Sequence, residues 1–95
     1  PPLKVYAGGL EDADRRAAYA LAADLRAAGI SADFDHASRS VKAQFKYAGK
    51  IGAEYVAVIG SDELARGEYT VKNMADSSSV SVRAEDIVAY FSEKA

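Results

Sequence analysis

Four basic residues are spaced so that they can bind an anion together. Lys42, Lys46 and Lys50 recur every four residues, and Arg39 stands one helical turn before them. Residues three or four apart lie on the same side of an α-helix, so this spacing predicts a basic stripe along one helix face. No acidic residue occurs between positions 36 and 53. Such a stripe is suited to phosphates; the alternative is a helix face that is merely solvated.

The distribution of charge supports the first interpretation. The net charge of the 95 residues is −2, yet residues 36–53 carry four positive charges and no negative ones. The remaining residues carry eight positive and fourteen negative charges, or −6. A basic face on an acidic body favours a directed contact with an anionic partner over diffuse attraction.

Composition excludes several kinds of site. The chain has no cysteine, so disulfides and thiolate metal sites are excluded. With a single histidine we do not expect a histidine-based zinc site, and we expect no cofactor in this chain. No segment has the length of a membrane span or the features of a signal peptide, which predicts a cytoplasmic protein with no membrane partner. The chain starts at Pro1 without an initiator Met. We therefore expect residues 1–95 to be one domain excised from a longer chain.

Two elements must position the basic stripe. Residues 39–52 have helical spacing, with Val41, Phe45 and Ala48 on an apolar face. The run Tyr55–Ile59 that follows is apolar and rich in β-branched residues. Such a run predicts a strand covered on both faces, at the centre of a sheet.

The remaining segments complete an α/β domain. The pattern predicts strands at Leu3–Ala7, Ile30–Phe34, Glu68–Met74 and Val80–Val82, helices at Glu11–Ala28 and Ala84–Lys94, and a helical turn at Ser61–Gly67. The first three strands, joined by helices, should be parallel. The turn before the last strand is too short for a parallel connection. The predicted fold is a three-layer α/β/α domain with a five-stranded mixed sheet and one antiparallel strand.

Open sheets of this kind bind ligands beyond the carboxyl ends of the parallel strands. Three loops are therefore candidates: Gly8-Gly9, which should end the first strand, and residues 35–39 and 61–67. The diglycine is a poor phosphate loop, because it lacks the G-x-G-x-x-G pattern and three carboxylates follow within five residues.

Three blocks of sequence resemble a known family. They are Arg39-Ser-Val-Lys-Ala-Gln-Phe-Lys-Tyr-Ala, Ile51-Gly-Ala-Glu-Tyr-Val-Ala-Val-Ile-Gly-Ser-Asp-Glu63 and Tyr69-Thr-Val-Lys-Asn-Met74. In this order and spacing they resemble the C-terminal anticodon-binding domain of histidyl-tRNA synthetase, a class IIa aminoacyl-tRNA synthetase. The threonyl, prolyl and glycyl enzymes share the domain in looser form. The resemblance covers essentially the whole chain and implies a five-stranded mixed sheet between helices.

The resemblance also implies a function in protein biosynthesis. The domain would grip the anticodon stem-loop of tRNA(His), while a separate catalytic domain of the same chain ligates histidine to the tRNA with ATP and Mg²⁺. The parent would be a homodimeric histidine–tRNA ligase. Because no catalytic residue is identified in these 95 residues, we expect the domain alone to be catalytically inert.

Site residues are transferred from the family by position. Glu63 and Lys72 would contact anticodon bases, and the start of the basic helix would contact the loop. A carboxylate can accept both N–H groups of a guanine Watson–Crick edge, while basic side chains bind phosphates or base carbonyls. The complete set of predicted RNA contacts is Glu63, Lys72, Gln44, Arg39, Lys42, Lys46 and His36.

Structural alternatives stay open for several of these residues. Glu63 could serve only the N-terminus of its helical turn, Lys72 could be an exposed strand residue, and His36 could be a loop residue.

Two other functions compete with RNA binding. A phosphorelay receiver needs acidic residues where this chain has Gly8-Gly9 and Gly60 after its strands, so that function is excluded. A synthetase-like regulatory protein, acting through protein or RNA contacts without aminoacylation, stays open.

Overall fold

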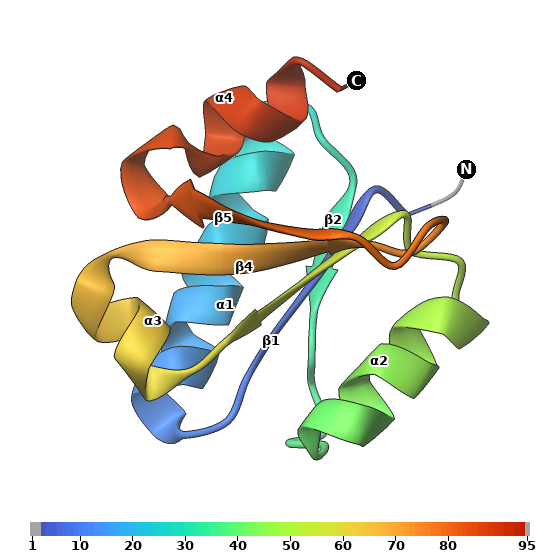
Figure 1. Cartoon of the computed structure of the whole chain (residues 1–95), viewed down its shortest axis with the longest axis vertical. Helices are drawn as coiled ribbons and strands as arrows, with labels where there is room; N and C mark the ends of the chain where they lie inside the picture. The colour runs from blue at the N-terminus through green and yellow to red at the C-terminus, as the bar shows by residue number, and fades with distance from the viewer. Residues whose placement is uncertain (1–2, 95) are drawn as a thin grey trace.

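The computed structural model describes residues 3–94 and contains one sheet with helices on both faces (Figure 1). In chain order the elements are β1 (Val5–Gly9), α1 (Asp12–Ala27), β2 (Ala32–Phe34), α2 (Val41–Lys50), β3 (Tyr55–Ile59), α3 (Ser61–Arg66), β4 (Glu68–Asn73), β5 (Ser79–Arg83), a 3-10 turn (Ala84–Asp86) and α4 (Ile87–Ser92). The predicted succession of strands and helices is confirmed.

The sheet has the order β2-β1-β3-β4-β5. β1 is parallel to β2 and β3, while β4 is antiparallel to both of its neighbours. The mixed sheet with one antiparallel strand is therefore as predicted. β3 lies at the centre, and its start and the start of β1 are level, with Val5 opposite Tyr55.

Two cores lie on opposite faces of the sheet, because successive strand residues point to opposite sides. The larger core joins the sheet to α1 and α4 through residues such as Leu25 and Phe91. The smaller core, beside α2, contains Tyr6 and Val56. α2 is the only helix on that face among the described residues, and it leaves the end of β3 partly open: Val56 is buried, but Val58 is only half-buried. The prediction of full coverage on both faces is wrong at Val58.

The diglycine does not end the first strand as predicted. Gly8 and Gly9 belong to β1 and pair with Val58 and Ile59 of β3. A Cβ on Gly9 would lie 2.4 Å from the backbone carbon of Asp14, so the first turn of α1 packs directly on the strand. A Cβ on Gly8 would lie 1.7 Å from Oε1 of Gln44, on α2. The two glycines thus allow helices to approach both faces of β1.

Candidate nucleic-acid interface

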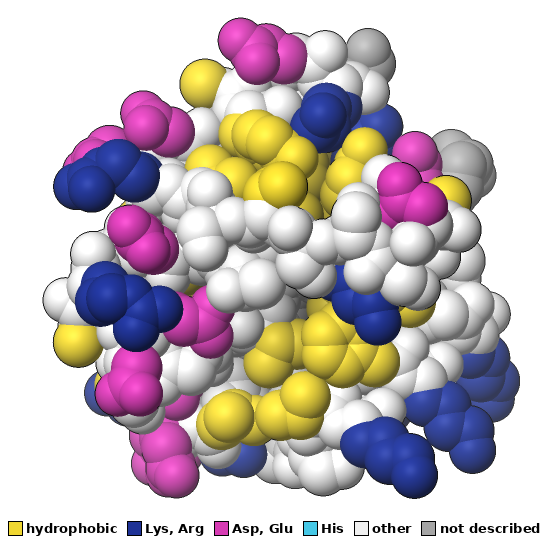
Figure 2. All heavy atoms as spheres, in the orientation of Figure 1, with side chains coloured by type: hydrophobic (Ala, Val, Ile, Leu, Met, Phe, Trp, Pro, Cys, Tyr) yellow, Lys and Arg dark blue, Asp and Glu magenta, His cyan; other side chains and the backbone are white. Residues whose placement is uncertain are grey.

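A groove of about 290 Å³ lies on the face that α2 leaves partly open. Its floor and walls are formed by Leu10, Val41, Phe45, Val58, Gly60, Glu63, Thr70, Lys72 and Ser79. Leu10 follows β1 and Gly60 follows β3, so the groove lies at the carboxyl ends of the central parallel strands, where open α/β sheets bind ligands. Figure 2 shows hydrophobic side chains gathered in this hollow, with basic side chains along the α2 side of the molecule.

The apolar character of the groove results from the rotation of α2. The buried residues of the helix are Gln44 and Ala48, whereas Phe45 is half-buried and Val41 is 38% exposed. The apolar face is therefore shifted around the helix from its predicted position. Val41 and Phe45 supply a wall of the groove, and Phe45 also packs against the smaller core.

The structure brings Glu63 and Lys72 together at this groove. The carboxylate of Glu63 accepts the N–H of Gly60 at 3.1 Å through Oε1 and the N–H of Thr70 at 3.0 Å through Oε2. Glu63 thus caps α3 and fixes the start of β4, which is the structural role left open for it. Each carboxylate oxygen has a second lone pair that can accept a further hydrogen bond, so these contacts do not prevent Glu63 from binding a base. A base contact by Glu63 stays a prediction.

Lys72 lines the same groove, from β4. Its Nζ is 4.9 Å from the centre of the Phe45 ring, at a distance typical of a cation–π contact. The side chain is half-buried, so Lys72 is not simply an exposed strand residue. The ammonium group therefore stands at the groove over an aromatic ring.

Gln44 is a correction to the predicted RNA contacts. Its side chain is fully buried, and Nε2 donates to the carbonyl oxygens of Gly9 at 3.0 Å and Arg39 at 2.7 Å. These carbonyls need donors because buried backbone oxygens without partners are unfavourable. Gln44 thus links β1 to the start of α2 and is not accessible to RNA.

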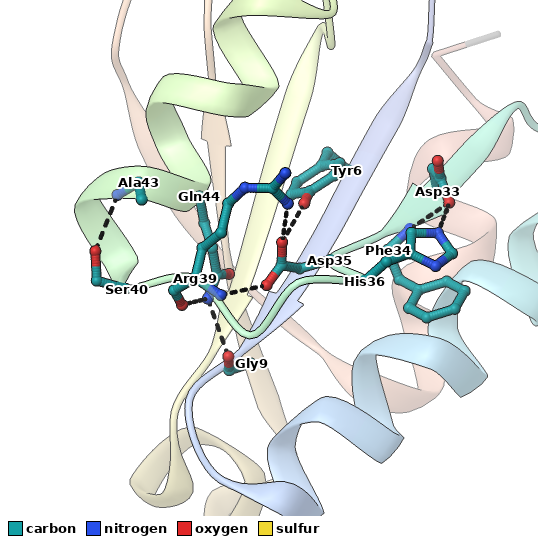
Figure 3. Close-up of polar contacts among 10 residues, drawn as sticks. All are labelled: Tyr6, Gly9, Asp33, Phe34, Asp35, His36, Arg39, Ser40, Ala43 and Gln44. Carbon is teal, nitrogen blue, oxygen red and sulfur yellow. Dashed lines mark hydrogen bonds and ion pairs between the residues drawn. The ribbon is translucent and has the colours of Figure 1, made fainter.

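Arg39 belongs to a network beside the N-terminus of α2 (Figure 3). Nη1 of Arg39 donates to Oδ1 of Asp35 at 2.6 Å, and the hydroxyl of Tyr6 donates to the same oxygen at 2.7 Å. The backbone N–H of Arg39 donates to Oδ2 at 2.9 Å. The guanidinium also stacks on Tyr47, with Cζ 3.9 Å from the ring centre.

The electrostatics of this network favour a charged carboxylate. Burial alone would raise the pKa of Asp35, but the hydrogen bonds from Tyr6 and Arg39 together lower it below its usual value. Burial, followed by the hydrogen bond to Asp35, raises the pKa of Tyr6. The carboxylate is therefore ionised and the phenol neutral at physiological pH.

Lys42 and Lys46 are exposed on α2, and neither forms an ion pair within residues 3–94. Lys46 borders a second hollow of about 410 Å³, which is also lined by Tyr47 and Lys50 of α2 and by Arg39, just before the helix. The two lysines are thus free of ion pairs at the surface, and their contact with phosphates stays a prediction.

His36 stands apart from the groove. Its Nε2 lies 3.0 Å from Oδ1 of Asp33, and its ring centre is 4.1 Å from that of Phe34. The side chain is 64% exposed but lines neither hollow. The loop role that the sequence left open describes its position, and an RNA contact by His36 stays a prediction.

Sequence reasoning missed several residues of the site. Leu10, Thr70 and Ser79 line the groove, and Asp35 holds Arg39. A signal existed for Asp35, since it precedes Arg39 by four residues in an otherwise uncharged segment. No comparable signal marks Ser79, which reaches the groove only because β5 pairs with β4.

Two kinds of feature are absent from the described part of the chain. No group of three acidic, histidine or cysteine side chains in residues 3–94 is arranged to hold a metal ion. None of the described helices is both long and apolar enough to cross a lipid bilayer.

Comparison with known proteins identifies the domain. A family model described as an anticodon binding domain matches residues 6–94. The chain is 48% identical over 77 residues to a histidine–tRNA ligase of Pelotomaculum thermopropionicum, covering 81% of this chain and 18% of the relative. It is 41% identical over 90 residues to a histidine–tRNA ligase of Symbiobacterium thermophilum, covering 95% and 21%. The chain thus spans about a fifth of the length of these relatives.

Solved structures agree with this result. Apo histidyl-tRNA synthetase of S. aureus superimposes with a TM-score of 0.90 at 36% identity, over 95% of this chain and 23% of that one. The RNA-binding domain of threonyl-tRNA synthetase from Cryptosporidium parvum has the same fold, with a TM-score of 0.86 at 14% identity, over 97% and 23%. The family match over nearly the whole chain, together with this fold, shows that the chain belongs to the anticodon-binding domain family and is of the histidyl-tRNA synthetase type.

Proposed function

We propose that this domain binds the anticodon stem-loop of tRNA(His) as part of a histidine–tRNA ligase. The observation that carries the proposal is the groove, in which an apolar hollow, a carboxylate and an ammonium group lie beside a free basic helix face. Unstacked bases of RNA loops bind to apolar and aromatic surfaces, where polar groups contact their edges.

The groove would bind a base of the RNA, and the basic stripe would bind its phosphates. Phe45 and Val58 provide an apolar surface for a base, while Glu63 and Lys72 offer an acceptor and a donor for its edge. Lys42 and Lys46 would contact phosphates, which position the strand without distinguishing its sequence.

The ligation of histidine to tRNA would be catalysed by the rest of the parent chain. Since the relatives are about five times longer than this domain, we assign ATP and Mg²⁺ to a catalytic domain outside it, in a homodimeric cytoplasmic ligase. Identities of 41–48% to ligases support such a parent over a regulatory protein without aminoacylation.

Lys72→Met tests the groove, because Met keeps the length and apolar contact of the side chain and removes only the charge. We expect the variant to bind a stem-loop with the histidine anticodon GUG about tenfold more weakly, the effect of one good specific contact. Fluorescence titration at one salt concentration measures this. Lys94→Met is a matched control, since Nζ of Lys94 also lies over an aromatic ring, 4.7 Å from the centre of Tyr90, away from the groove.

Single-base variants of the loop complete that test. If Lys72 contacts a base, the loss caused by Lys72→Met should shrink when that base is replaced. Equal binding of wild type and Lys72→Met to every loop would contradict the assignment of the groove as the base site.

The basic stripe predicts a change in salt dependence. For each phosphate contact that Lys42→Ala or Lys46→Ala removes, the slope of log affinity against log salt should flatten by roughly 0.7 to 0.9. The double variant should therefore flatten it by about twice that amount, for loops of any sequence. Arg66→Ala, which removes an exposed cation on α3, should leave the slope unchanged. An unaltered slope in the double variant would mean that the stripe is only solvated.

A further inference from the structure

Arg39 differs from the other cations of the basic stripe, because its side chain is held in one place. It is bonded to Asp35 and stacked on Tyr47, while the lysines of the stripe form no ion pairs in the described range. The backbone is held as well, since Gln44 donates to the carbonyl oxygen of Arg39. The side chain is nevertheless 29% exposed.

Asp35 and Tyr6 lie behind this arginine. The Asp35 side chain is only 1% exposed, and it accepts hydrogen bonds from the guanidinium and the backbone N–H of Arg39 and from the hydroxyl of Tyr6. Three hydrogen bonds fix the orientation of the carboxylate, which in turn fixes the guanidinium. A guanidinium has five N–H donors, and one of them serves Asp35, so donors are left for an anion.

The surroundings of Arg39 favour an anion. The guanidinium borders the 410 Å³ hollow that Lys46, Tyr47 and Lys50 also line. An arginine ordered during folding loses no further rotamer freedom when it binds, whereas an exposed lysine must be ordered at that moment. Its planar fork also matches two phosphate oxygens, which an ammonium group cannot do.

We infer that Arg39 is a fixed docking point for one phosphate of the bound RNA, and that Asp35 and Tyr6 are its positioning residues. The inference rests on the proposed function, because the phosphate belongs to the anticodon stem-loop. The competing explanation is that Arg39 only neutralises a buried carboxylate and touches no RNA.

Arg39→Lys separates these explanations, because it keeps the charge and removes the fork. Affinity for the GUG stem-loop should fall about tenfold, while the salt slope stays unchanged because the number of charges is the same. Arg66→Lys is the matched control: Nε of Arg66 lies 3.7 Å from Glu68, but away from both hollows, and its affinity should equal that of wild type. Unchanged affinity in Arg39→Lys would overturn the inference.

Asp35→Asn tests the positioning role of Asp35, because the two explanations predict opposite changes in RNA affinity. If Asp35 were only a negative charge near RNA, its removal would leave binding equal or tighter. A positioning role predicts binding about fivefold weaker, with no further loss when Arg39 is already Ala. Tyr6→Phe, which keeps the ring and removes only the hydroxyl, provides the same test if Asp35→Asn does not fold, with an expected loss of about twofold. Tighter binding or full additivity with Arg39→Ala would overturn the positioning role.

The outcomes also separate this inference from the function on which it rests. If the wild-type chain does not bind the GUG stem-loop, both fail together. If wild type binds and the lysine variants lose affinity while Arg39→Lys does not, the proposed function stands and only the docking role of Arg39 fails.

Discussion

Gly9→Ala is expected to destabilise the domain by at least about 3 kcal/mol, a large part of the 5–15 kcal/mol that stabilises a typical domain. The added Cβ would lie 2.4 Å from the backbone carbon and 2.5 Å from the next backbone nitrogen at the Asp14–Arg15 peptide. Backbone atoms of α1 cannot rotate away, so the helix must shift from the sheet. Urea denaturation followed by circular dichroism measures the loss.

Gly8→Ala should also destabilise the domain, but for a different reason. Its Cβ would lie 1.7 Å from Oε1 of Gln44, the end of a flexible side chain that can leave. The carbonyl oxygens of Gly9 and Arg39 would then lose their donor, at a cost of about 1–3 kcal/mol.

A double-mutant cycle separates the two glycines. In a Gln44→Ala background the obstacle at Gly8 is gone, so Gly8→Ala should add almost no further destabilisation. Gly9→Ala should keep its full effect in the same background, because its obstacle is backbone. Equal effects of Gly8→Ala with and without Gln44 would show that Gln44 does not pack against Gly8.

The sheet could be predicted because its signals are local. The apolar run of β3 and the alternation of strand and helical spacing before it are sufficient to assign parallel strands joined by helices. The short connection between β4 and β5 then required an antiparallel pair.

The diglycine and Gln44 could not be predicted, because tertiary packing overrides their local preferences. Gly8 and Gly9 have the propensity of a turn, yet they stand in a strand so that two helices can approach. Gln44 is polar and was expected on the surface, yet it is buried to serve two backbone carbonyls. The same packing turns α2 so that Val41 and Phe45 face a groove.

The family resemblance predicted Glu63 and Lys72 as base contacts, which stays a prediction, and the structure shows that both line one groove. No local pattern predicts that the groove exists. It arises because α2 covers only part of its face of the sheet. The position of a helix over a sheet cannot be read from amino-acid composition.

Glu63→Gln is expected to change both stability and recognition. The carboxylate gives one oxygen each to the N–H groups of Gly60 and Thr70, but a glutamine has only one oxygen. Either the half-buried N–H of Gly60 or the exposed N–H of Thr70 must then face its NH₂ group. Loss of a cap and of one acceptor should reduce the free energy of unfolding by about 1–3 kcal/mol. Urea denaturation in the absence of RNA measures this loss of stability.

Recognition is measured separately, on folded protein at one salt concentration. Glu63 lines the groove and each of its oxygens has a second lone pair, which matches the two N–H groups of a guanine edge. Glu63→Gln should therefore weaken binding to the GUG loop by a further 1–3 kcal/mol or so, and should have little effect on loops in which that guanine is replaced. A loss of equal size for all loops would show that Glu63 only holds α3 and β4 in place. Base recognition would then depend on Lys72. Its charge is removed by Lys72→Met, which leaves the contacts of Glu63 with the Gly60 and Thr70 N–H groups in place.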